Sequence, residues 1–114
     1  MRASIQQALI SVWQQALVDN EPFVILGERS YRVKKTSKTH LRQVDFVCEG
    51  QKIRGIEQNP ESKSRWAQVA REGKLVMQFL FEDAYVASVA DGVFTAYSGS
   101  KTATQSTKSN PSQA

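Results

Sequence analysis

The chain contains 114 residues with a formal net charge of +4, one cysteine and one histidine. This length predicts a single domain, the lone cysteine excludes an internal disulfide, and no apolar run reaches the roughly 18 residues of a membrane-spanning helix. We therefore expect a soluble cytoplasmic protein whose basic excess favours an acidic partner.

An amphipathic helix is predicted near the start of the sequence. Apolar residues recur at the i, i+3, i+4, i+7 spacing in "IQQALISVWQQALV", and uncharged glutamines fill the opposite side. We expect about four turns, ending at Asp19-Asn20. Pro22 forbids further helix and starts an extended run.

Alternating segments follow, as expected for strands with one buried face. "FVILG" predicts a strand, "ERS" a tight turn and "YRVKK" the partner strand, with Arg32 and Lys34 pointing outward. After a polar loop, "HLRQVDFVC" and "QKIRGIE" are predicted to pair across a turn at Glu49-Gly50. Gly55 inside the second of these strands predicts a bulge or a close backbone approach.

A short second helix is predicted before Gly73, a residue suited to the position just after a helix. Asn59 could cap its start with Pro60 at the first helical position, or Ser62 or Ser64 could cap a later start.

Two interpretations of this helix start remain open. Its free N–H groups and basic side chains could bind an anion such as a phosphate or a partner carboxylate. Alternatively, it is a capped helix with a solvated basic face and an apolar stripe on the sheet. The anion site would use Ser62, Lys63, Ser64 and Arg65, and the stripe Trp66, Val69 and Ala70.

The last strands complete an α+β fold. "KLVMQFLFE" is nearly continuous in apolar residues, which predicts a central strand covered on both faces, and "AYVASVA" and "VFTAY" pair across Asp91-Gly92. We expect a mainly antiparallel sheet of about six to seven strands with an N-terminal amphipathic helix and one short inserted helix. Residues 1–97 form this single domain, and the Ser/Thr-rich residues 98–114 are predicted to be a disordered tail.

One part of the sequence resembles a known group of proteins. The run "RGIEQNPESKSRWAQVAREGKLVMQF", followed by "YVASVADG", looks like short uncharacterised proteins of the cyanobacterial type. The resemblance covers residues 54–92 and, more loosely, the strands before them. It implies a cytoplasmic setting but no activity and no site residues.

The sequence offers little for catalysis or metal binding. Cys48 and His40, the only nucleophile–base pair of that kind, lie ~26 Å apart if they share one continuous strand. One cysteine and one histidine cannot build a zinc site, and the carboxylates of Asp45 and Glu57 lie among basic residues that favour ion pairing. We expect no enzyme, no cofactor and no metal, with Cys48 acting as a small buried hydrophobe.

Basic residues are the remaining candidates for function. A dense basic run lies between positions 29 and 42, and a second outward pair follows on a later strand. We predict a non-enzymatic accessory or adaptor module that docks on an acidic protein surface through a basic face. The alternative is a nucleic-acid binder that uses the same face on phosphates, and a third possibility is self-association, over which a monomer is favoured. The predicted binding residues are Arg32, Lys34, Lys52, Arg54, Lys63 and Arg65.

Overall fold

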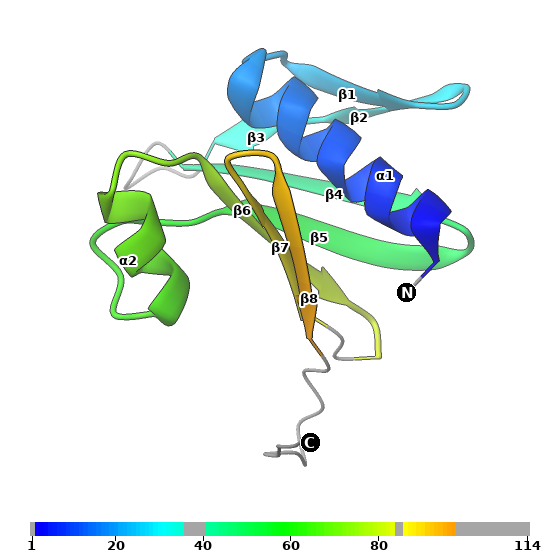
Figure 1. Cartoon of the computed structure of the whole chain (residues 1–114). Coiled ribbons are helices and arrows are strands. Elements are labelled where there is room, and N and C mark those ends of the chain that lie inside the picture. Colours follow the sequence, from blue (N-terminus) through cyan, green and yellow to red (C-terminus); the bar gives the residue numbers. More distant parts are fainter. Residues whose placement is uncertain (1, 36–40, 84–85, 98–114) are drawn as a thin grey trace.

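A computed structural model describes residues 2–35, 41–83 and 86–97, and these form the predicted α+β fold (Figure 1). Six strands make one antiparallel sheet in the order β3-β4-β5-β6-β7-β8, so each strand pairs with its neighbour in the chain, and β1 and β2 form a separate hairpin. The strands are β1 (Phe23–Leu26), β2 (Arg29–Arg32), β3 (Lys34–Lys35), β4 (Arg42–Cys48), β5 (Gln51–Glu57), β6 (Val76–Phe81), β7 (Val86–Ala90) and β8 (Val93–Tyr97). The predicted tail at 98–114 lies outside the described residues.

The N-terminal helix α1 (Ala3–Trp13) continues into the π-helical turn η1 (Gln14–Val18). In this wider turn the Asp19 N–H donates to the Gln14 carbonyl, five residues back, at 2.8 Å. Asn20 then adopts a φ of +54°, a left-handed conformation that stops the helix and redirects the chain towards Pro22. The predicted helix and its end at Asp19-Asn20 are therefore confirmed.

The first turn of α1 contains no acidic residue of its own. Glu49, in the turn between β4 and β5, supplies one, because its carboxylate accepts hydrogen bonds from Arg2 and from the Ser4 hydroxyl. A carboxylate near a helix N-terminus is stabilising, since the N–H groups there carry partial positive charge.

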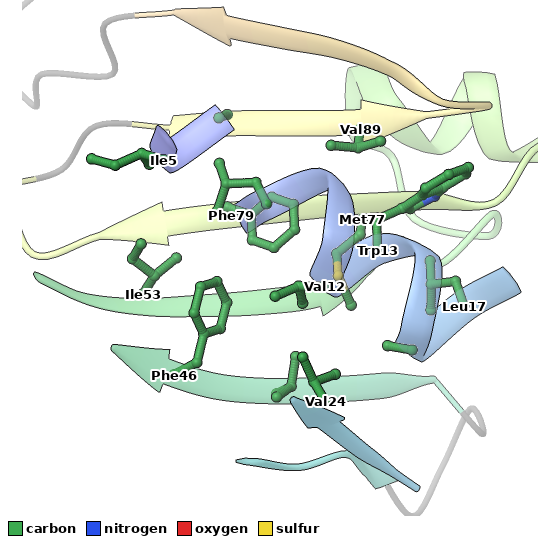
Figure 2. Close-up of a cluster of buried hydrophobic side chains, with 14 of the residues drawn as sticks. Ile5, Val12, Trp13, Leu17, Val24, Phe46, Ile53, Met77, Phe79 and Val89 are labelled. Atoms are coloured by element: carbon green, nitrogen blue, oxygen red, sulfur yellow. The ribbon is translucent and has the colours of Figure 1, made fainter. Parts of the chain in front are cut away.

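The core lies between one face of the six-stranded sheet and the layer formed by α1 and the β1–β2 hairpin. Figure 2 shows side chains of α1 and of the strands pointing towards one another across this layer. The Trp13 indole N–H donates to the Leu75 carbonyl at 2.8 Å, which fixes the end of α1 beside the start of β6. The buried members include Ile5, Leu9, Val12 and Trp13 from the helix and Phe46, Ile53, Met77, Phe79 and Val89 from the strands.

Gly55 allows the close packing within this core. A Cβ atom there would lie 2.9 Å from Cε1 of Phe79 and 3.2 Å from Sδ of Met77. Strand pairing continues through Gly55 without an extra residue, from Val44 on one side to Phe79 on the other. The strand has no bulge at Gly55. The glycine instead permits a close approach, as predicted, but the atoms that approach it belong to side chains and not to the backbone.

The hairpin turns agree with the sequence at two positions and differ at one. The two-residue turns at Glu49-Gly50 and Asp91-Gly92 have positive φ at both residues, as type I′ turns require. The first hairpin turns at Gly27-Glu28, because Leu26 pairs with Arg29. The prediction of "ERS" as the turn was wrong, since Gly27 accepts the positive φ and Ser30 belongs to the strand.

The predicted strand "YRVKK" divides between the two sheets. Its first part, within β2, pairs with β1, and its last two residues form β3 at the edge of the larger sheet. Val33 lies at the division, where its N–H donates to the Pro22 carbonyl at 2.9 Å. This break folds the hairpin back over the sheet (Figure 1).

Strand β6 is covered fully on only one face. Met77, Phe79 and Phe81 point into the core, but on the opposite face Leu80 is 41% exposed. The predicted coverage on both faces was therefore wrong, because on this second face Val76 is buried, Gln78 is half-buried and Leu80 is exposed.

The second helix, α2 (Arg65–Arg71), begins at the latest of the three predicted starts. Ser64 is its N-cap, with a side-chain oxygen that accepts from the Ala67 N–H at 3.1 Å. Asn59 instead stabilises a preceding turn, accepting from the Glu61 N–H at 2.9 Å. Gly73 has a φ of +87° just past the helix end, as predicted.

The side of α2 that faces the sheet differs from the predicted stripe. Ala67 is the buried residue of the helix, whereas Trp66, Val69 and Ala70 are only half-buried. The tryptophan of the main core is Trp13.

Candidate functional site

A hollow of about 650 Å³ opens where the end of the first helix meets the division between β2 and β3. The backbone hydrogen bond from Val33 to Pro22 joins the strand side of this hollow to the segment that follows the helix. We call it the basic hollow, and its lining residues are Asn20, Glu21, Pro22, Arg32, Val33, Lys34, Lys35 and Arg42.

Arg42 lines the basic hollow, but its guanidinium is held by contacts within the fold. Its guanidinium binds both carboxylate oxygens of Glu57, at 2.9 and 3.1 Å, and donates to the Ala16 carbonyl at 2.8 Å and to Asn20 at 2.9 Å. The carbonyl is at the C-terminal end of the helix, where a cation is stabilising. Arg42 is therefore already neutralised and hydrogen-bonded, which leaves it little capacity for a ligand.

Three other cations of the basic hollow remain available. Arg32, Lys34 and Lys35 are exposed, and none of them forms an ion pair with another described residue. Glu21 is the single carboxylate of the lining, so the three cations leave a positive excess that suits an anionic group.

Lys35 was missing from the predicted binding residues. Strict alternation from the outward-pointing Arg32 and Lys34 turns Lys35 inward, where a binding role is not expected. It is exposed because β3 is only two residues long and pairs with Arg42 and Gln43 at the sheet edge. The Lys34-Lys35 dipeptide is the sequence signal that could have identified it.

Lys52 and Arg54 lie in a different place from Arg32. They project from the face of the sheet opposite the core, beside a second hollow of about 500 Å³ that also contains Asp45, Leu80 and Glu82. Arg54 pairs with Asp45 at 2.9 Å. Two cations and two carboxylates balance here, so this surface has no positive excess. Of the predicted strand residues, the structure brings Arg32 and Lys34 together in one hollow and Lys52 and Arg54 in another.

Lys63 and Arg65 flank the Ser64 cap at the start of α2, and both are exposed. Neither lines the basic hollow or the second hollow. The polar turn before them is held from within, because Arg71 donates to the Pro60 and Ser62 carbonyls at 2.6 and 3.1 Å. The capped-helix interpretation thus accounts for the described contacts of this segment.

The described residues show no arrangement that activates Cys48. The thiol is half-buried against the core, and burial, with a smaller effect from the Glu49 charge, raises its pKa above the ordinary value for cysteine. A raised pKa keeps the thiol protonated and poorly nucleophilic near neutral pH. His40 lies outside the described residues.

The carboxylates Asp45 and Glu57 form the ion pairs expected of them, with Arg54 and Arg42. Within residues 2–35, 41–83 and 86–97, no three metal-binding side chains come together. No helix in the same ranges is long and apolar enough to cross a bilayer.

Comparisons with protein-family models, with curated proteins and with solved structures each find no match to this chain. The resemblance to short cyanobacterial-type proteins stays a prediction.

Proposed function

We propose that the protein is a non-catalytic accessory or adaptor module of the cytoplasm that docks on an acidic surface of another protein. The basic hollow carries this proposal, because Arg32, Lys34 and Lys35 gather there without carboxylate partners among the described residues. Carboxylates of a partner would neutralise these cations at little cost, since all three are already solvent-exposed.

Nucleic-acid binding is the second candidate, and one observation favours it. Phe23 is exposed and lies directly across the hairpin from Arg32, so a base could stack on the ring while a phosphate contacts the guanidinium. One feature favours a protein instead: Ile25, which is more exposed than Phe23, offers an apolar contact and no stacking surface.

Binding assays at physiological salt separate the two candidates. We expect a labelled poly-glutamate peptide to bind with a salt-dependent affinity, and random single- and double-stranded DNA and RNA to bind no better than the usual non-specific range of roughly 10⁻⁴–10⁻⁶ M. If nucleic acid binds more tightly than the peptide at about 150 mM salt, acidic-protein docking is wrong and nucleic-acid binding is the function.

Charge reversal tests the location of the site. The double variant Lys34→Glu/Lys35→Glu should abolish peptide binding, because it reverses two of the three available cations. Lys63→Glu/Lys74→Glu, at two exposed lysines outside the basic hollow, is the control with the same change of net charge, and it should bind within about twofold of the unmodified chain, since distant exposed charges contribute little. Equal loss in both variants would mean that net charge, and not the basic hollow, governs binding.

A further inference from the structure

The β1–β2 hairpin presents an apolar surface next to the basic hollow. Val24 and Tyr31, which pair across the hairpin, point inward to the core, so the alternate positions point away from it. Phe23 and Ile25 occupy these outward positions and are 49% and 59% exposed.

This apolar pair is continuous with the basic hollow. Phe23 follows Pro22, a lining residue, and pairs across the hairpin with Arg32, another lining residue. Ile25 pairs with the small Ser30, which does not cover it. A ligand lying along β1 would thus meet two apolar side chains and then a group of cations.

We propose that the partner segment is an acidic peptide that also carries bulky apolar residues. Its apolar side chains pack on Phe23 and Ile25, and its carboxylates enter the basic hollow beside Arg32, Lys34 and Lys35. This inference rests on the proposed function and specifies the chemistry of the partner. Apolar burial supplies affinity that does not depend on salt, whereas the ion pairs supply orientation and a salt-dependent part.

Two other occupants fit this surface less well. A second copy of the chain meeting it through a two-fold contact would bring the same cations against each other, which is repulsive. An anionic bilayer is recognised by clusters of roughly four to eight cations, whereas the basic hollow offers only Arg32, Lys34 and Lys35 among the described residues.

The test compares two labelled peptides of equal length and charge, one alternating glutamate with leucine and one alternating glutamate with serine. The unmodified protein should bind the leucine peptide about tenfold more tightly, which corresponds to about 1.4 kcal/mol. Ile25→Ser and Phe23→Ser should each reduce this preference and leave the salt slope unchanged. Val93→Ser removes a different exposed apolar side chain, on β8, and should preserve the preference.

The outcomes distinguish this inference from the function on which it rests. If both peptides bind equally, and Lys34→Glu/Lys35→Glu abolishes both, the apolar contact is refuted while acidic docking stands. If neither peptide binds, the proposed function fails as well. If the protein binds phosphatidylserine vesicles more strongly than the leucine peptide, and Ile25→Ser loses this binding, the ligand is a membrane and not an acidic peptide. If sedimentation shows a mass that rises with concentration, and Ile25→Ser abolishes the rise, the surface binds a second copy of the chain and not an acidic peptide.

Discussion

Arg42 and Arg54 each hold a carboxylate at 2.9 Å, but their surroundings differ. The side chains of the Arg42–Glu57 pair are each 15% exposed, whereas those of Arg54 and Asp45 are 55% and 45% exposed. Arg42 also holds the end of the first helix through the Ala16 carbonyl. The free energy that each pair contributes to folding should therefore differ strongly.

We expect Arg42→Ala to lower the free energy of unfolding by about 3–5 kcal/mol, because it leaves the largely buried Glu57 carboxylate without its cation and with only the backbone N–H of residue 42 as a donor. Arg54→Ala should change it by no more than about 1 kcal/mol, since exposed ion pairs contribute little. Urea denaturation followed by circular dichroism measures both. Similar losses in the two variants would contradict the role assigned to burial.

Gly55 has no side chain, and this leaves room for the Phe79 ring in the core. Gly55→Ala should lower the free energy of unfolding by about 1–3 kcal/mol, because the added methyl group overlaps the Phe79 ring. Denaturant titration measures the loss. The control is Gly55→Ala combined with Phe79→Leu, where the ring is gone and the combined loss should be smaller than the sum of the two single losses. Strictly additive losses would show that the ring and the methyl group do not clash.

At the scale of elements, Gln15 links the helical segment to the hairpin. Its side-chain amide accepts from the Ile25 N–H at 2.8 Å and donates to the Ile25 carbonyl at 3.0 Å. It thus satisfies backbone groups on the edge of β1 that does not pair with β2. Unpaired strand edges invite association with other chains, so this contact also protects the hairpin.

Removal of this amide should loosen the hairpin. We expect Gln15→Ala to lower the free energy of unfolding by about 1–2 kcal/mol, since its two hydrogen bonds to the hairpin are lost together with the one to the Ser11 hydroxyl. Hydrogen exchange of the Ile25 amide should become faster. Gln7→Ala, at an exposed glutamine of the same helix, should leave both quantities unchanged. Unaltered Ile25 exchange in Gln15→Ala would refute the contact.

The elements also show which parts of the fold can be predicted from sequence. The helix and the turns at Glu49-Gly50 and Asp91-Gly92 follow from local periodicity and local backbone preference, and they were predicted correctly. The division of "YRVKK" at Val33 and the exposure of Leu80 were not predicted. Both depend on which layer covers which face, and alternation within one strand carries no such information.

At the scale of the whole molecule, the arrangement of the two sheets determines which basic residues gather in one place, and the sequence alone does not show this. The basic run identified Arg32 and Lys34, but only the arrangement of the two sheets places them with Lys35 and separates them from Lys52 and Arg54. The exposure of Phe23 and Ile25 has the same origin, since nothing among the described residues covers the outer side of the hairpin.

The core can be followed along the part of the chain that the structure describes. Its described members begin at Ile5, and the last hydrophobic residue packed against it is Ala96. The Ser/Thr-rich composition of residues 98–114 predicts that they add nothing to the folded domain, so we expect a chain shortened to residues 1–97 to unfold in urea with a free energy within about 0.5 kcal/mol of the full chain. A larger loss would show that residues 98–114 contribute to the folded domain.

The contact between Trp13 and Leu75 has a consequence for the protein during its synthesis. The two residues are 62 positions apart, so at a synthesis rate of 5–20 residues per second the helix waits roughly 3–12 s for the start of β6. The strands, by contrast, pair with immediate neighbours and can form hairpins as they emerge. For those seconds the apolar stripe of α1 lacks its partners on β6 and β7, and the nascent chain is more exposed to aggregation and to capture by chaperones than the complete fold.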